Sequence, residues 1–228
     1  MRRGLGFLLT GVLALLAAGR VAAADWQVAQ HENGLTIYTR SVEGQDLKDF
    51  RGIVRVKAPL QRVLQALVDV EAMPSWFFNM TEARLLDSNG PAQSHIYFVI
   101  KGMWPVSDRD GVLRLQIRQD ERTLAVTLDG RAAPEHYPPM RTRVRIPRLQ
   151  AGWTVTPVAP DETEIRLDGQ ADPGGSIPVW MANMVVVELP EVTLKNLRQQ
   201  LEDPTAPVRD PATDPRINKL LKGIKYPE

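Results

Sequence analysis

Asp108, Arg109 and Asp110 form a dense group of side chains that could do chemistry. On a strand, residues two apart share a face, so the two carboxylates would lie fairly close together. Paired carboxylates act as general acid and base when their pKa values are driven apart. No matched acid and base accompanies this pair. We therefore expect structural pairing and assign no catalytic residue.

The three histidines are scattered along the sequence. His31 falls in a turn, His95 starts an apolar strand and His136 falls in a proline-rich loop, and their spacing matches no metal-ligand pattern. The sequence also lacks the nucleophilic-serine, zinc-peptidase, P-loop and dinucleotide signatures. We expect neither a metal nor a cofactor, and we expect the protein not to be an enzyme.

The first 24 residues are typical of an export signal. Arg2 and Arg3 precede an uncharged apolar run over residues 5–18, and Ala22-Ala23-Ala24 fits the small-residue rule for cleavage before Asp25. An uncleaved anchor is the alternative, but this run is shorter than the roughly 20 residues of a spanning helix. We predict a secreted or periplasmic protein, the latter assuming a Gram-negative source.

Composition limits the remaining function classes. The chain has no cysteine, which excludes disulfides, thiolate metal sites and cysteine nucleophiles. Cleavage after Ala24 would lower the formal net charge from +1 to about −2. This charge balance gives no reason to expect nucleic acid as a partner.

Alternation with a period of two predicts a sheet with one solvated face. Phe50, Val54 and Val56 alternate with polar residues, and hairpin signals flank Asn33-Gly34. Further strands are predicted over residues 95–101, 113–118, 124–128, 141–146, 153–158 and 164–171. Their short connections predict an antiparallel meander.

Two helices are expected to position these strands. Pro59 opens the first, whose apolar stripe runs from Leu60 to Val68. Gly174-Gly175 allows a sharp turn into a long second helix capped by Ser176, which Pro190 should kink or divide. Residues 203–228 then form a proline-rich linker and a short basic segment.

Several strings resemble the START (steroidogenic acute regulatory protein-related lipid transfer) domain family. Residues 104–110, read as WPVSDRD, are similar to a PVSxRD stretch, and residues 172–180, DPGGSIPVW, are similar to the entry to the family's last helix. Other positions that match the family occur in the expected order along the chain, namely residues 34–40, Asp69 with Trp76, and Pro190. The resemblance covers about residues 25–201.

The resemblance implies an α+β helix-grip fold. A curved antiparallel sheet would wrap around a long C-terminal helix and enclose an apolar cavity. Over residues 25–202, such a domain would bind one lipid or other hydrophobic molecule and carry or present it across an aqueous compartment. Its implied partners are the lipid and, transiently, a membrane, and we expect a monomer.

Candidate ligand-binding residues follow from the resemblance and from side-chain type. Arg109 could meet a polar ligand group or instead pair with a neighbouring aspartate. Aromatic and methionine side chains could line a cavity or be ordinary core. The full set is Trp76, Phe77, Tyr97, Trp104, Arg109, Trp180, Met181 and Met184.

The chain departs from relatives that hold phosphatidylcholine. Met73 and Phe77 stand where those proteins carry an arginine and an acid for the headgroup. This difference favours a less polar ligand. Two other functions stay open: an enzyme of the helix-grip superfamily acting on an apolar substrate, and an adaptor whose tail, residues 216–225, docks on an anionic membrane or partner.

Overall fold

The computed structural model describes residues 25–45, 47–210 and 213–227. The predicted export signal and its cleavage site after Ala24 lie outside this part of the chain. The strands are β1 (Gln27–Glu32), β2 (Leu35–Arg40), β3 (Asp49–Val56), β4 (Met80–Ser88), β5 (Ser94–Ile100), β6 (Arg109–Gln119), β7 (Val126–Ala132), β8 (Val144–Arg145), β9 (Arg148–Ala159) and β10 (Glu162–Asp172). The helices are α1 (Leu60–Val68), α2 (Val179–Glu202) and α3 (Pro215–Leu220), with short 3-10 helices η1 (Val70–Ser75), η2 (Gly90–Ala92) and η3 (Pro134–His136).

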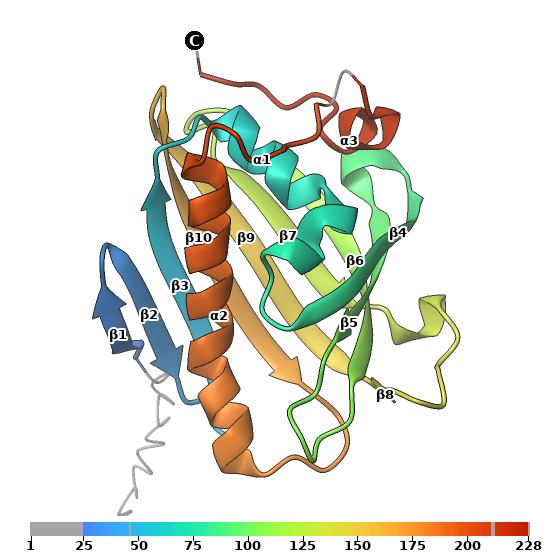
Figure 1. Cartoon of the computed structure of the whole chain (residues 1–228). Helices are drawn as coiled ribbons and strands as arrows, with labels where there is room; N and C mark the ends of the chain where they lie inside the picture. The colour runs from blue at the N-terminus through green and yellow to red at the C-terminus, as the bar shows by residue number, and fades with distance from the viewer. Residues whose placement is uncertain (1–24, 46, 211–212, 228) are drawn as a thin grey trace, which may run out of the picture.

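The described strands form one curved sheet in the order β1-β2-β3-β10-β9-β7-β6-β5-β4. The pairings along this path are antiparallel, as predicted, and α2 lies across one face of the sheet (Figure 1). β3 shows the predicted alternation, since Val54 and Val56 are buried and Arg55 is exposed. The α+β helix-grip architecture is confirmed.

The strand predicted over residues 141–146 is wrong for most of its length. Only the two residues of β8 pair, and they run parallel to β6, with Val144 opposite Arg109. The residues before β8 form a loop against the convex face of the sheet. Its Arg143 donates a hydrogen bond to the Tyr97 hydroxyl at 2.7 Å. The segment is therefore held by side-chain contacts before β8 and by a short backbone pairing with β6 at β8 itself.

The sequence pattern gave no prediction for β4. Register shifts between Met80 and Glu82 and between Leu85 and Asp87 break its pairing with β5. Bulges of this kind interrupt the two-residue period on which the sequence argument rests.

Helix α2 is continuous from Val179 to Glu202, so of the two predicted effects of Pro190, a kink or a division, the division does not occur. Pro190 is buried against β3, where its Cβ would lie 3.3 Å from a Cβ placed on Gly52. Packing against the sheet therefore compensates for the backbone hydrogen bond that proline cannot make. The predicted Ser176 cap is also wrong, because the N-cap is Pro178, which makes no side-chain cap bond.

The main core lies between the C-terminal half of α2 and the sheet. A Cβ on Gly52 would lie only 2.5 Å from Cδ1 of Leu194, so glycine allows the helix to sit close to β3. Thr193, which is fully buried, accepts a hydrogen bond from the Phe78 backbone N–H at 3.1 Å. Leu194 and Leu197 complete the buried face of the helix.

The segment after α2 packs back onto the domain. Ile217 and Leu220 of α3 are buried in the same core as α1 and α2. No helix among the described residues is long and apolar enough to cross a membrane.

Candidate ligand-binding site

A hollow of about 680 Å³ lies at one end of the molecule. It is bounded by the start of α2, the turn that precedes it, the loop after β2 and the neighbouring ends of β7, β9 and β10. Ligand pockets in proteins are typically about 300–1,000 Å³, so the hollow is large enough for a lipid-sized guest. Its lining residues are Gly44, Gln45, Leu47, Arg131, Ala132, Pro147, Arg148, Leu149, Gln150, Gln170, Asp172, Pro173, Gly175, Ile177, Val179 and Ala182.

The lining is mixed, so the prediction of a purely apolar cavity is too simple. Leu149, Ile177 and Ala182 offer apolar surface, whereas Gln150 and Gln170 are polar. The strand ends curve at this edge, and residues from both faces of the sheet therefore reach the hollow. Deeper along α2, the protein's own side chains fill the space beneath the helix.

The turn before α2 has the conformation that its glycines predict. Gly174 and Gly175 have φ angles of 68° and 64°, in the left-handed region that favours glycine. A Cβ on Gly174 would lie 3.0 Å from the Arg145 carbonyl oxygen. The turn thus packs closely on the segment around β8 and forms one wall of the hollow.

Arg109 lies directly behind this turn. Its Nη2 is 3.9 Å from the position of a Cβ on Gly175, and only 7% of the residue is exposed. It shares a face of β6 with Gly111, where a Cβ would meet the ring of the core residue Phe98. Arg109 therefore points toward the concave, helix-covered side of the sheet.

The aspartates beside Arg109 have other partners. Asp110 is fully buried on the opposite face and pairs with Arg145, while Asp108 accepts a hydrogen bond from the Gly102 N–H. The Arg109 side chain donates through Nη1 to the Ser107 carbonyl oxygen, and its buried Nε has no partner. Within the described part of the chain, no carboxylate forms an ion pair with it. The expected pairing with a neighbouring aspartate is wrong.

Burial lowers the pKa of the Arg109 guanidinium, and the charge of Asp108 only partly offsets this effect. Arginine nevertheless stays protonated at neutral pH. The structure thus holds a buried positive charge next to a hollow, without a carboxylate partner of its own.

Two of the predicted aromatic residues belong to the core. Trp76 is 1% exposed and packs edge-on against Trp153, with ring centroids 6.0 Å apart. Phe77 is partly buried beside it, at 5.9 Å. Neither residue lies among those that line the hollow, because the chain after η1 turns them under α2.

Tyr97 faces away from the helix. It belongs to a separate apolar cluster with Val99 and Val112 on the convex face, where it packs against Tyr137. The strand period gives the reason, since the neighbouring Ile96 and Phe98 point to the main core.

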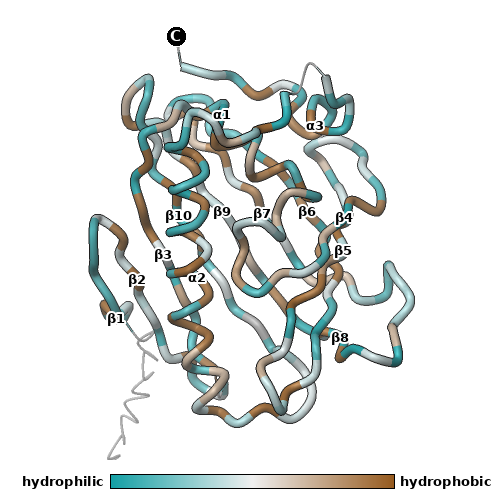
Figure 2. The backbone as a smooth tube through the Cα atoms, viewed as in Figure 1, coloured by the Kyte–Doolittle hydropathy of each residue, from teal (hydrophilic) through white to brown (hydrophobic). Residues whose placement is uncertain are grey.

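The remaining predicted residues, from the start of α2 and from the loop between β5 and β6, differ in how much of each side chain is exposed. Met181 is buried, whereas Met184 is 44%, Trp180 67% and Trp104 92% exposed. Trp104 lies in the loop between β5 and β6, which reaches the same end of the molecule as the start of α2 (Figure 1). Figure 2 shows that the first half of α2 is hydrophobic along most of its length. None of the four is among the residues that line the hollow, and the three exposed ones, Trp104, Trp180 and Met184, form what we call the apolar rim.

Sequence reasoning missed most of the lining residues. Val179 and Ala182, three apart, place one face of α2 on the hollow, beside the predicted Trp180 and Met181. The polar members, such as Gln150 and Gln170, carry no sequence signal for a binding role. Only the curvature of β9 and β10 brings them there.

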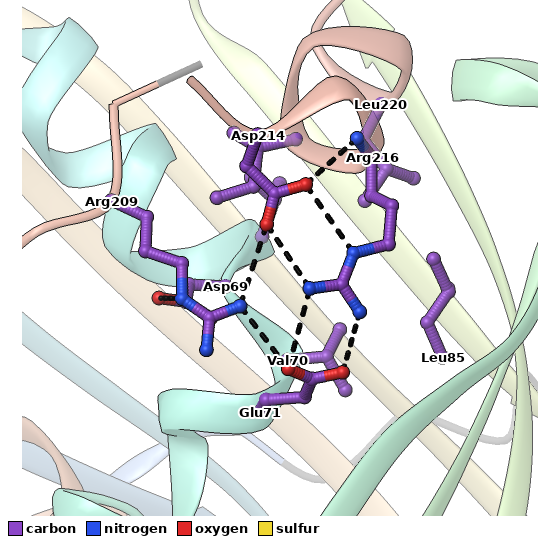
Figure 3. A pocket seen from close by; sticks show the side chains of 10 residues that line it. Asp69, Val70, Glu71, Leu85, Arg209, Asp214, Arg216 and Leu220 are labelled. Carbon is purple, nitrogen blue, oxygen red and sulfur yellow. Dashed lines mark hydrogen bonds and ion pairs between the residues drawn. The ribbon is translucent and has the colours of Figure 1, made fainter. Parts of the chain in front are cut away.

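A second hollow, of about 20 Å³, is too small for an organic ligand. Its walls carry an ion-pair network in which Arg216 and Arg209, from the tail, meet Glu71 at 2.5 Å and 3.1 Å, and Arg209 also pairs with Asp69 (Figure 3). Burial raises the pKa of Asp69, whereas hydrogen bonds from Arg216 and then Arg209 lower that of Glu71. We assign this network to attachment of the tail.

The curved sheet, the long C-terminal helix and the hollow beneath its first turns define a helix-grip domain. A START domain family model matches residues 11–205, most of the chain. The chain therefore belongs to the START domain family.

Relatives support this membership. The uncharacterized protein PA1579 of Pseudomonas aeruginosa is 34% identical over 191 residues, covering 81% of this chain and 91% of that protein. The crystal structure of a STAR-related lipid transfer protein from Xanthomonas axonopodis is 38% identical, with a TM-score of 0.73 over 78% of this chain and 99% of that chain. The mouse phosphatidylcholine transfer protein is 23% identical over 168 residues, 72% of this chain and 77% of that protein.

Proposed function

We propose that this START domain binds one lipid in the hollow beneath α2 and carries or presents it across an aqueous compartment. Removing one buried CH₂ from water contributes about 0.8 kcal/mol, so a long acyl chain leaves a membrane slowly without a carrier. An apolar site offsets most of that cost. Such a task needs no chemical turnover, and we propose binding rather than catalysis as the activity.

The observation that carries this proposal is the position of Arg109. A buried guanidinium without a carboxylate partner is costly, and it is stabilised by an acceptor that enters the adjacent hollow. Arg109 lies behind Gly175, which lines that hollow, with the Val144 side chain beside both residues, and Arg109 itself is not among the lining residues. A lipid with an anionic or strongly accepting group, lying with its tail along Ile177 and Leu149, fits both properties.

The sequence departure at Met73 and Phe77 narrows the ligand class. Both side chains are partly buried against the main core, away from the residues that line the hollow. They offer no charge to a zwitterionic headgroup. We therefore propose a fatty acid, a sterol-like or isoprenoid molecule, or a phospholipid other than phosphatidylcholine.

The exposed rim supports contact with a membrane during loading. Trp104 and Trp180 are largely exposed at the end of the molecule where the hollow lies. Tryptophan favours the membrane–water interface, because its ring is apolar and its N–H is polar. We propose that this end faces the bilayer while the lipid moves.

Export is a separate part of the proposal. It rests on the charged start, the apolar run and the alanines that end at Ala24. Fractionation of the native host should recover a chain that begins at Asp25 outside the cytoplasm. Recovery of the uncleaved chain in the cytoplasm would contradict this part alone.

Native mass spectrometry of the protein from its own host tests the binding function. We expect one lipid per chain, and the same stoichiometry after delipidation and exposure to a lipid extract of that host. A chain that stays empty after both treatments, with its fold intact by circular dichroism, contradicts the carrier function. A chemically altered lipid in the extract would point to the enzyme alternative.

A further inference from the structure

Two of the three histidines, far apart in the sequence, meet at one carboxylate. His95 Nδ1 lies 2.8 Å from Oδ1 of Asp87, and His136 Nε2 lies 2.8 Å from Oδ2 of the same group. The two imidazole rings stack with centroids 3.4 Å apart and planes inclined by 18°. Nothing in their scattered sequence positions indicated this cluster.

Strand pairing places two of these three groups next to each other. Asp87 pairs directly with His95 across β4 and β5, just after the register shift between Leu85 and Asp87. Residues directly opposite share a face of the sheet, and a bulge changes which side chain reaches that face. His136 comes from η3, in the loop that covers the convex face of the sheet. The cluster is therefore separate from the hollow beneath α2.

The chemistry of the three side chains suits a metal ion. Two imidazoles and a carboxylate are a set of ligands that divalent transition metals bind.

We infer that Asp87, His95 and His136 form a binding site for a divalent transition-metal ion such as Zn²⁺. Their ligand atoms all lie within 4.8 Å of one another. A tetrahedral ion with bonds of about 2.0–2.1 Å needs ligand atoms about 3.3 Å apart. The stacked rings direct their nitrogen lone pairs nearly parallel, so the His136 ring would have to turn out of the stack to bind the same ion as His95. His136 is exposed on a short loop, which makes this movement easy.

Three protein ligands leave a fourth position for water. Asp87 is exposed and His95 is buried, so the ion would sit at the surface with one side anchored in the sheet. It would also tie η3 to the β4–β5 edge. Arg114 of β6 is the register partner of His95 and is exposed on the same face of the sheet, so the site has a neighbouring positive charge as well as the negative charge of Asp87.

Calorimetric titration of Zn²⁺ into the untagged mature protein tests this inference. We expect one ion per chain, and at least about tenfold weaker binding for His95→Ala and for His136→Ala, because even outer partners of metal ligands matter that much. His31→Ala is the matched control, since His31 is exposed on β1 and contacts Thr36 instead. Its affinity should equal that of the wild type.

Thermal unfolding gives a second measurement. Zn²⁺ should raise the Tm of the wild type and of His31→Ala, because an ion that binds only the folded state stabilises it, and should raise the Tm of His136→Ala less at the same Zn²⁺ concentration. A wild type that binds no Zn²⁺, Co²⁺ or Ni²⁺ overturns the inference. So does a His136→Ala variant that binds as tightly as the wild type; since His136 is exposed, this variant should keep its fold.

Discussion

Asp110 and Arg145 form a two-point ion pair that spans the convex face of the sheet. Nε of Arg145 donates to Oδ1 and Nη2 to Oδ2, both at 2.9 Å, and the Asp110 side chain is fully buried. Nη1 of Arg145 also donates to the carbonyl oxygens of Pro134 and Tyr137. The pair joins β6 to β8 and the preceding loop, and it leaves Arg109 without that aspartate.

Replacing Asp110 should therefore cost much stability. Asp110→Asn leaves a partly buried guanidinium without its counter-charge, and breaking such a pair costs about 3–5 kcal/mol. The free energy of unfolding in urea measures this loss. Arg55→Gln is the control, because its ion pair with Glu164 is largely exposed and contributes about 1 kcal/mol or less. Equal losses for the two variants would contradict the role of the Asp110–Arg145 pair.

In contrast to Asp110, Arg109 should contribute little to stability and much to lipid binding. Arg109→Met removes a buried charge that has no carboxylate partner, so we expect stability to change by no more than about 1 kcal/mol. Lipid binding should weaken about tenfold or more, because a charge-assisted hydrogen bond contributes about 1.5–3 kcal/mol. Arg114→Met, on the exposed side of the same strand, is the matched control for binding. A severe loss of stability with unchanged lipid binding would show that Arg109 serves the fold.

The apolar rim should contribute to membrane binding and not to the stability of the fold. Trp104→Ala combined with Trp180→Ala removes two largely exposed rings, and such surface changes usually alter stability by about 0.5 kcal/mol or less. Sedimentation with vesicles should show weaker association and slower lipid transfer. Val158→Ala, also an exposed apolar residue but at the other end of β9, should have no effect. Unchanged vesicle association in the double variant would exclude the rim as the contact surface.

Acid should weaken the attachment of the tail. Hydrogen bonds from Arg216 lower the pKa of Asp214 to about 2 in the folded protein. A lowered folded-state pKa contributes stability above the unfolded value, and that contribution disappears between about pH 4 and about pH 2 as the carboxylate is protonated. Glu71 acts in the same direction, and the raised pKa of Asp69 opposes them.

The wild type should therefore lose stability over this range more steeply than Asp214→Asn. Urea unfolding at a series of acidic pH values measures the slopes. Asp161→Asn, in the exposed turn between β9 and β10, should follow the wild type. Parallel curves for wild type and Asp214→Asn would contradict this assignment.

The apolar side of α3 should stabilise the whole domain. Leu220 is 1% exposed in the main core, and truncation of such a side chain to alanine costs about 2–5 kcal/mol. Denaturant unfolding of Leu220→Ala should show this loss in a single transition. Lys222→Ala, exposed two residues later, should change stability by about 0.5 kcal/mol or less. A stable Leu220→Ala variant would leave the tail available for the docking role considered from the sequence.

The sequence by itself determined features that depend on neighbours along the chain. The alternation in β3 predicted which residues are buried, because a strand turns successive side chains to opposite faces. Gly174 and Gly175 predicted the turn into α2, because few other residues accept left-handed backbone angles. These local rules, with the family strings, were enough for the fold class, but they left Arg109 between two predicted strands, whereas it is the first residue of β6.

Only the tertiary structure decided which groups meet. Asp110 pairs with Arg145, 35 positions away, and the neighbouring Arg109 points to the other face. His136 reaches His95 through the loop before β8, and Trp180 lies at the surface beside the buried Met181. Sheet curvature, bulges and loop packing set these contacts. They arise from energies summed over distant segments, which a local pattern of residues does not contain.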